Sequence, residues 1–371
     1  MRNGIGEESS MFRLVKRELR LIFSDSGAML LLLFAMLIYA TIYSIAYGAE
    51  VVEDVPIVVV DEDNTSVSHT IIEGLRAGAN TVVAYEAQSV AEAKELFYRR
   101  KAFGVVVVPD GFERSLYASQ GTTISLILDG SHLLLYRAVL EQTMAELLAR
   151  TNGGVVSLSS EVLYNRSLGY GSFVMPSIVV LLIQQTLLIG VGMVAIRRRR
   201  HRALMGCKTW FYSVWQVLSI ELTHILIYGV SLTVVLITLW PIFGFPANGG
   251  IGDIVVLMLL YIIASSAFAQ VVSHLFRRRE APILTLLWSS VPVLLLAGVS
   301  YPREAFPLWL YDLGRLFPSS SAVDGFISLN TMGASLQNIR SEMADVVILA
   351  FLYTFVAVIL EKRTYNSKNS E

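Results

Sequence analysis

Long apolar blocks separated by charged segments dominate the hydropathy pattern of this chain of 371 residues. A helix needs about 20 consecutive apolar residues to cross a hydrocarbon core of about 30 Å. Six blocks reach or approach that length, and the last two are the shortest: 27–47, 172–196, 214–240, 254–276, 282–299 and 344–360. The pattern therefore predicts six transmembrane helices.

The segment between the first two blocks, residues 48–171, has the mixed pattern of a water-soluble domain. Short runs rich in β-branched residues, such as VPIVVV and AFGVVVVP, predict strands. Helical patterns lie between these runs, and Ser89 with Glu92 has the spacing of a capping box at the start of one helix. Strands that alternate with helices indicate an α/β domain.

Basic residues gather in alternate loops. IRRRRHRAL, residues 196–204, directly follows the second block, and Lys and Arg also flank the first, fourth and last blocks. The loop 241–252 has no basic residue. Because cytoplasmic loops are enriched in Lys and Arg, both termini are predicted to be cytoplasmic, and the arginine run is first interpreted as a topology marker. The predicted fold is a membrane all-α bundle of six transmembrane helices with an inserted extracytoplasmic α/β domain.

The segments outside the blocks complete this organisation. Residues 1–26 contain MFRLVKRELRLIF, in which a helix would put four apolar residues on one face and basic residues mostly on the other. The apolar set is Phe12, Val15, Leu19 and Ile22. Such a pattern predicts a cytoplasmic amphipathic helix in the membrane interface, with its basic groups facing anionic lipid. Residues 361–371 are expected to form a cytoplasmic tail.

Composition supports a membrane protein and argues against other classes. Hydrophobic residues make up 54% and charged residues 16% of the chain, whereas soluble domains have about 45–50% and 25%. The net charge of -1 provides no basic field for nucleic acid. A single cysteine, Cys207, excludes an intrachain disulfide. The sequence has no GxxxxGK[ST] loop, so no P-loop ATPase site is expected in this chain.

Two acidic motifs are candidates for metal sites, and both fit a structural role better. Asp61-Glu-Asp63-Asn64-Thr65 begins like a calcium loop but lacks its glycine and its final glutamate, which favours a solvated turn. Glu221 and His224 lie one helical turn apart inside the third block, but a di-iron site needs a second Glu-x-x-His motif. No metal, cofactor or catalytic residue is therefore predicted.

Polar residues within the blocks remain candidates for function, because ionisable groups inside a membrane are costly. Glu221 and His224 are predicted to form a buried pair that stabilises the bundle or lines a polar path. Gln184, Gln185 and Gln270 are expected to make hydrogen bonds between helices.

Several stretches, in order along nearly the whole chain, resemble the type-two ABC exporter permeases with a long first loop. IVVVDEDNTSVSH resembles the first strand and turn outside the membrane, and AFGVVVVPDGFERSL and ISLILDGS resemble later strands. YNRSLGYGSFVMPSIV resembles the start of the second span. LLAGVSYPREAFPLWLYDLGRLFPSSSAVDGF resembles the loop after the fifth span.

The resemblance implies a bacterial cytoplasmic (inner) membrane protein that pairs with a second copy or a paralogue and is driven by separate ABC ATPase subunits, which use the ATP. In this family the loop after the second span contacts the ATPase, here the segment from Arg197 to Trp210. The implied coupling residues are Arg197, Arg198, Arg199, Arg200 and Arg202. The loop after the fifth span is implied to dip back towards the membrane, with Pro302, Pro307 and Trp309 at its aromatic and proline-rich part.

The leading hypothesis is therefore the transmembrane permease subunit of an ATP-driven exporter of a drug, lipid, glycan or peptide, with a periplasmic adaptor as a further partner. Export as the direction follows from the family alone. A sensor whose outer domain binds a ligand is the alternative, and a lipid-modifying membrane enzyme is a third class. A co-purifying ATPase would favour the transport hypothesis. A signalling partner without an ATPase would favour the sensor, and lipid turnover by the isolated chain would favour the enzyme.

Overall fold

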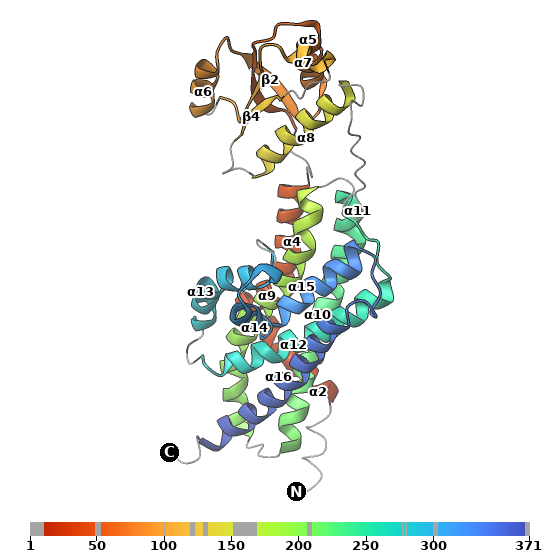
Figure 1. Cartoon of the computed structure of the whole chain (residues 1–371). Coiled ribbons are helices and arrows are strands. Elements are labelled where there is room, and N and C mark those ends of the chain that lie inside the picture. Colours follow the sequence, from red (N-terminus) through yellow and green to blue (C-terminus); the bar gives the residue numbers. More distant parts are fainter. Residues whose placement is uncertain are drawn as a thin grey trace. The chain divides into compact units, whose positions relative to one another are not determined.

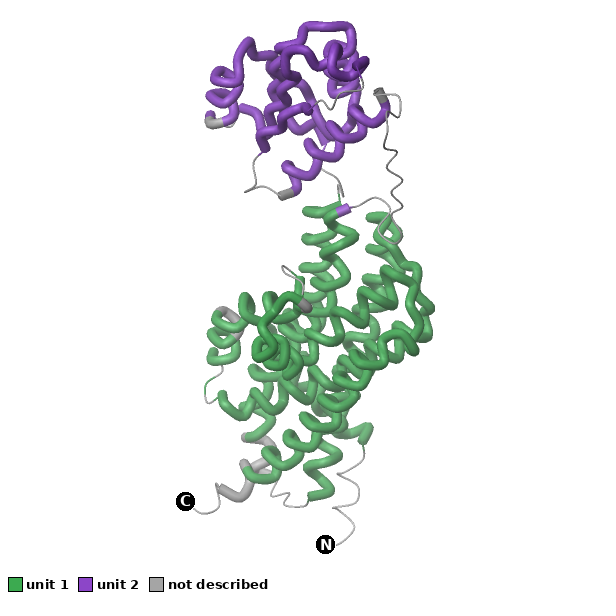
Figure 2. Tube along the Cα trace, in the orientation of Figure 1, with its two compact units in different colours: residues 1–48, 164–166, 170–371 green, residues 49–163, 167–169 purple. Residues whose placement is uncertain are grey.

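The computed structural model describes residues 11–48, 53–99, 101–118, 123–128, 133–150, 169–205, 210–276, 278, 280–299 and 303–367. Two compact units divide the chain, as Figure 2 shows. Unit 1 comprises Met1–Gly48, Tyr164–Arg166 and Tyr170–Glu371, and unit 2 comprises Ala49–Leu163 and Ser167–Gly169.

Unit 1 is a helical bundle (Figure 1). Its helices up to the 240s are α2 (Met11–Phe23), α3 (Ser26–Met29), η1 (Leu30–Phe34), α4 (Ala35–Tyr47), α9 (Tyr170–Met205), α10 (Trp210–Val234), η2 (Val235–Leu239) and α11 (Trp240–Phe243). The later helices are α12 (Ile251–Ser273), α13 (Ala281–Leu296), η3 (Arg303–Ala305), α14 (Leu308–Gly314), α15 (Pro318–Phe326), η4 (Ile327–Thr331) and α16 (Arg340–Ser367).

Five described helices are long and apolar enough to cross a membrane: Ser26–Tyr47, Tyr170–Arg199, Trp210–Phe243, Ile251–Ser273 and Arg340–Arg363. The predicted fifth block, 282–299, differs, because it forms only α13, a helix of 16 residues. At 1.5 Å per residue α13 is about 24 Å long, which is less than the hydrocarbon core. Gly298, with a φ of +80°, follows the end of α13. The bundle thus has five full-length candidate spans among its described residues, not the six expected.

The helices α9 and α12 form the centre of unit 1. In the most apolar part of each span, 83% of the residues of α9 and 61% of those of α12 are buried. The corresponding shares are 33% in the first span and 28% in the last. Apolar side chains from both central helices meet those of the first span, α10, α15 and α16 in one continuous core. The outer faces of the remaining spans carry exposed apolar side chains, as expected for helices in lipid.

The predicted apolar face of the N-terminal helix is only partly correct. Val15 and Ile22 are buried in α2, but Phe12 is 75% exposed, and Leu14 and Glu18 complete the buried face. Periodicity does not reveal that a glutamate can be buried when another helix supplies its counter-ion.

Unit 2 is an α/β unit. Its elements are β1 (Val55–Asp61), α5 (Ser66–Ala77), β2 (Thr81–Glu86), α6 (Val90–Tyr98), β3 (Gly104–Val108), α7 (Phe112–Tyr117), β4 (Ser125–Leu128) and α8 (Leu133–Arg150). The strand order is β2-β1-β3-β4. β1 is parallel to both neighbours, and β4 is antiparallel to β3.

Both faces of this sheet are covered, which explains the unbroken apolar runs of β1 and β3. Ile57 and Val59 face the cluster formed with α5, α7 and α8. Val58 and Val60 face the opposite cluster, which includes α6. Successive residues of one strand thus supply two cores, as the alternation of side chains along a strand requires.

The acidic turn after β1 uses its carboxylates within the fold. Asp61 Oδ1 accepts hydrogen bonds from the backbone N–H groups of Asp63 (3.2 Å) and Asn64 (2.9 Å). Asp63 Oδ2 accepts from Thr65 Oγ1 (2.6 Å) and from the N–H of Glu113 (3.0 Å) at the start of α7. Burial raises the pKa of Asp63, but these hydrogen bonds outweigh it and hold the pKa below its ordinary value. The motif is therefore a structural turn that joins β1 to α7.

Candidate functional site

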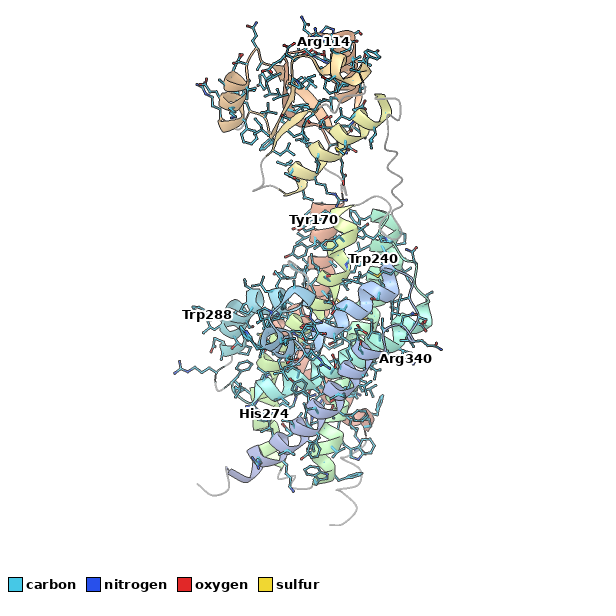
Figure 3. The ribbon with its side chains drawn as sticks, viewed as in Figure 1. Arg114, Tyr170, Trp240, His274, Trp288 and Arg340 are labelled. Atoms are coloured by element: carbon cyan, nitrogen blue, oxygen red, sulfur yellow. The ribbon has the colours of Figure 1, made fainter. Side chains whose placement is uncertain are left out.

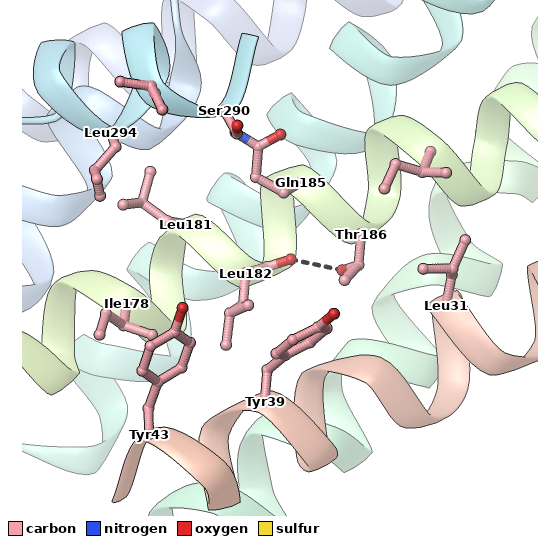
Figure 4. A pocket seen from close by; sticks show the side chains of 12 residues that line it. Leu31, Tyr39, Tyr43, Ile178, Leu181, Leu182, Gln185, Thr186, Ser290 and Leu294 are labelled. Carbon is pink, nitrogen blue, oxygen red and sulfur yellow. Dashed lines mark hydrogen bonds between the residues drawn. The ribbon is translucent and has the colours of Figure 1, made fainter. Parts of the chain in front are cut away.

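A hollow of about 420 Å³ lies in unit 1 between the first span, α9 and α13. Figure 4 shows Tyr39 and Tyr43 on the first span facing α9, with Ser290 on α13. The lining residues are Leu31, Tyr39, Tyr43, Ile178, Leu181, Leu182, Gln185, Thr186, Ile189, Ser290, Val291 and Leu294. Most of them are apolar or aromatic, with a few polar groups, which is the usual composition of a small-molecule site.

The polar groups that line the hollow differ in whether they are already hydrogen-bonded within the protein. Thr186 Oγ1 donates to Leu182 O at 2.6 Å and shares a second hydrogen bond of 2.6 Å with the hydroxyl of Tyr228. Gln185 Oε1 is buried and has no hydrogen-bond partner among the described residues. An unpaired buried carbonyl is costly, so Gln185 offers a ligand a buried acceptor that has no partner among the described residues.

Adjacent glutamines of α9 therefore have different roles. Gln184 is buried, and its Oε1 accepts a hydrogen bond of 2.9 Å from the backbone N–H of Ser319 at the start of α15. Gln185 instead lines the hollow. The sequence identified both as polar groups in a span, but it contained no signal for the tyrosines, Thr186 or Ser290.

The loop after α13 folds back into the bundle. The helix α15 is buried along almost its whole length, and it contacts Gln184 in the middle of the α9 span. Of the three residues proposed for this loop, Pro307 precedes α14, Trp309 on α14 is 68% exposed, and Pro302 lies outside the described residues. The exposed indole and the buried α15 are consistent with a loop that has one surface at the interface and one in the protein.

Ion pairs that sequence analysis missed anchor this loop. Arg303 is buried and pairs with Asp324 of α15. Arg315 Nε donates to Asp345 Oδ2 of α16 at 3.0 Å. The hydrogen bond and the charge of Asp345 raise the pKa of Arg315 above its ordinary value. These partners lie 21 and 30 residues apart in the chain, so no short motif reveals them.

Glu221 and His224 do not share a hydrogen-bond partner. Both residues are buried on α10, but Glu221 Oε1 accepts a hydrogen bond of 2.8 Å from Thr354 on α16. His224 Nδ1 instead shares a hydrogen bond of 2.7 Å with Ser266 on α12. Each residue thus joins α10 to a different helix. Gln270 on α12 is also buried, and its Nε2 has no partner among the described residues.

The arginine run is helical and turns partly inward. Helix α9 continues through it to Met205, beyond the end of the second apolar block at residue 196. Arg198 is 5% exposed and pairs with Glu18 of α2, whereas Arg197 and Arg199 bind backbone oxygens. For Arg200 and Arg202 the structure describes the helical backbone. Residues 197–205 contain no glycine or proline, and Arg198 has a buried carboxylate partner, which explains why the helix does not end at the apolar boundary.

The chain is similar to known proteins over most of its length. The family model described as "ABC-2 family transporter protein" matches residues 27–360. The chain is similar to the "Probable multidrug ABC transporter permease YbhR" of Escherichia coli strain K12, with 24% identity over 353 residues, which cover 91% of this chain and 94% of that protein. The protein of the same name from Escherichia coli O157:H7 gives the same values. A match across most of the chain confirms the resemblance seen in the sequence, and the chain belongs to the ABC-2 family of ABC transporter permeases.

Proposed function

We propose that this chain is the permease subunit of an ATP-driven exporter and that the hollow between the first span, α9 and α13 binds the transported molecule. Family membership supports the transport role. The hollow carries the proposal for the site, because it combines a mostly apolar and aromatic lining with the unpaired Gln185 acceptor. Such a lining favours an aromatic or amphipathic, drug-like molecule that can donate a hydrogen bond. The similarity to a probable multidrug permease supports the same class of substrate.

The energy source in this proposal is a separate ABC ATPase, and the working unit contains two permeases, either two copies or a copy and a paralogue. Exposed apolar residues on both sides of the hollow support a pairing there. Ile42 on the first span is 54% exposed, and Trp288 on α13, labelled in Figure 3, is 81% exposed. In the membrane the termini are cytoplasmic and unit 2 is extracytoplasmic, where a periplasmic adaptor can bind it. The alternation of basic loops supports this orientation.

The first test is purification of the tagged full chain from its native membrane in mild detergent. We expect an ABC ATPase to co-purify in stoichiometric amount. Proteoliposomes of that complex should take up an aromatic amphipathic dye when ATP is supplied to the ATPase side. Absence of both the ATPase and ATP-dependent dye movement would contradict the transport role.

The second test addresses the hollow. Gln185→Leu and Tyr39→Ala should raise the dye concentration that gives half-maximal transport, while the amount of bound ATPase remains unchanged. Leu226→Ala is the control, because Leu226 is 52% exposed on α10 and does not line the hollow. Equal transport constants for all three variants and the parent would place the substrate elsewhere.

A second candidate function, ligand sensing by unit 2, is favoured by one observation. A hollow of about 620 Å³ lies at the carboxyl ends of β1 and β2 and is lined by Asp61, His69, Glu73, Glu86 and neighbouring residues. The carboxyl edge of parallel strands is the usual ligand position in α/β sheets. A ligand that protects the amides of this edge from hydrogen exchange, without any ATPase partner, would support the sensor.

A further inference from the structure

The arginine run joins three parts of unit 1. Arg198 Nε donates to Glu18 Oε2 at 2.9 Å, and a second guanidinium nitrogen binds the other carboxylate oxygen. The exposed fractions are 5% for Arg198 and 1% for Glu18. Both partners of this pair are almost fully buried. In the pairs Arg303–Asp324 and Arg315–Asp345, by contrast, at least one partner is partly exposed. A pair of this geometry is held by two parallel hydrogen bonds as well as by charge.

The neighbouring arginines bind in different directions. Arg197 Nη1 donates to Ser24 O at 3.3 Å, just beyond the end of α2. Arg199 binds the carbonyl and hydroxyl oxygens of Ser273 and, at 3.4 Å, the carbonyl of Phe276. These carbonyls lie at the C-terminal end of α12, where helical C=O groups lack partners within the helix and attract cations. Three consecutive side chains of α9 therefore hold α2 and the end of α12.

The helix α2 is also fixed on a second side. Arg17 donates to Tyr212 Oη at 2.7 Å and to Gln216 Oε1 at 2.6 Å, both on α10. Adjacent residues of α2, Arg17 and Glu18, thus bind two different transmembrane helices. Because α2 precedes the first span by only a short turn at Asp25, a shift of α2 is passed to the span that lines the hollow.

We propose that the Arg198–Glu18 pair is a clamp that transmits movement of the arginine end of α9 to α2 and the first span. This inference rests on the proposed function, in which a separate ABC ATPase drives the permease. Separating two opposite charges in a buried site is strongly unfavourable, so α9 and α2 move together at this point. The first three arginines are then internal positioning residues, and the ATPase contact begins beyond them, towards Met205.

Charge reversal tests the clamp in the complex with the co-purified ATPase, reconstituted in proteoliposomes. The variants are Glu18→Arg, Arg198→Glu and the double variant that exchanges the two charges. Arg13→Glu is the control, since Arg13 is an exposed residue of α2, the helix that carries Glu18, and undergoes the same change of charge as Arg198→Glu. The measurements are the amount of bound ATPase, the ATPase rate without dye, the stimulation of that rate by dye, and ATP-dependent dye transport.

We expect both single variants to bind the ATPase and to keep the rate without dye within about twofold. Dye stimulation and transport should fall at least tenfold, and the double variant should recover to within about threefold of the parent. The control should behave like the parent. Recovery in the double variant is not expected if Arg198 contacts the ATPase directly.

Full transport in the single variants, loss of ATPase binding in them, or no recovery in a folded double variant would each overturn the clamp. If the single variants do not fold, Arg198→Lys provides the test, because lysine keeps the positive charge but cannot make the bidentate hydrogen bond to Glu18. It should lower dye stimulation while the ATPase stays bound, and unchanged stimulation would count against the clamp. Failure of the proposed function is recognised separately, because the parent complex itself would then show no ATP-dependent transport.

Discussion

Gly190 allows the first span to pack closely against α9. A Cβ atom at this position would lie 2.4 Å from Cγ and 2.5 Å from Cδ2 of Leu32, whose side chain is 1% exposed in the core. Carbon atoms pack at about 3.5–4.0 Å, so Gly190→Ala forces Leu32 or the backbone of η1 to move. Small residues commonly allow such close contacts between transmembrane helices.

A matched substitution isolates the cost of this clash. Gly229 lies in α10, and a Cβ added there meets nothing within 4 Å. Both glycine-to-alanine changes gain about 1 kcal/mol of helix propensity, but only Gly190→Ala also incurs overpacking of about 1–3 kcal/mol. The free energies of unfolding of the two variants should therefore differ by about 1–3 kcal/mol, with Gly190→Ala the less stable.

Unfolding in mixed micelles with increasing SDS fraction measures this difference, and a double variant checks its cause. Leu32→Ala alone should cost about 2–5 kcal/mol. In that background the methyl group at position 190 enters the vacated space, so adding Gly190→Ala should be neutral or stabilising. If Gly190→Ala is as stable as Gly229→Ala, or if its effect is the same with and without Leu32, the close-packing argument is refuted.

Three further predictions concern single polar groups. Gln184→Leu leaves a buried N–H of α15 unpaired and should cost about 1–3 kcal/mol of stability in the same SDS assay. Gln185→Leu removes a buried acceptor that has no partner among the described residues, so it should leave stability unchanged or raise it, and it should weaken dye transport. Equal stability losses would contradict these separate roles. Glu221→Gln keeps an acceptor for the Thr354 hydroxyl of α16 and should change the free energy of unfolding by less than about 1 kcal/mol. Glu221→Leu removes the acceptor and should cost about 1–3 kcal/mol. Similar losses in both variants would contradict the hydrogen-bond role. Folding lowers the pKa of Asp63, so the stability that this carboxylate contributes is present above the ordinary pKa of 3.8 and is lost as the pH falls through the lower folded value. Asp63→Ala removes the acceptor for the Glu113 amide and should increase hydrogen exchange at that amide at pH 7. No increase would show that the carboxylate does not fix α7.

Local sequence determined the approximate positions of the spans and the order of strands and helices in unit 2. Long apolar blocks require helices in a membrane because no water is present to satisfy the backbone, and the described spans lie at or near the predicted blocks. The strand and helix order of unit 2 follows from short apolar runs separated by turns. The order of motifs along the chain identified the permease family, which the comparison with known proteins confirms.

Tertiary structure decided which polar groups meet. Glu221 and His224 share a helical face, but their partners are on two other helices, 133 and 42 residues away. Glu18 and Arg198 are 180 residues apart, so neither the burial of Glu18 nor the inward turn of Arg198 is visible in local periodicity. The hollow likewise needs side chains from three separated segments. Short-range patterns determine where helices form, whereas the partner of a buried charge or hydrogen-bonding group depends on which helices pack together, because only a neighbouring helix can replace the water that the group has lost.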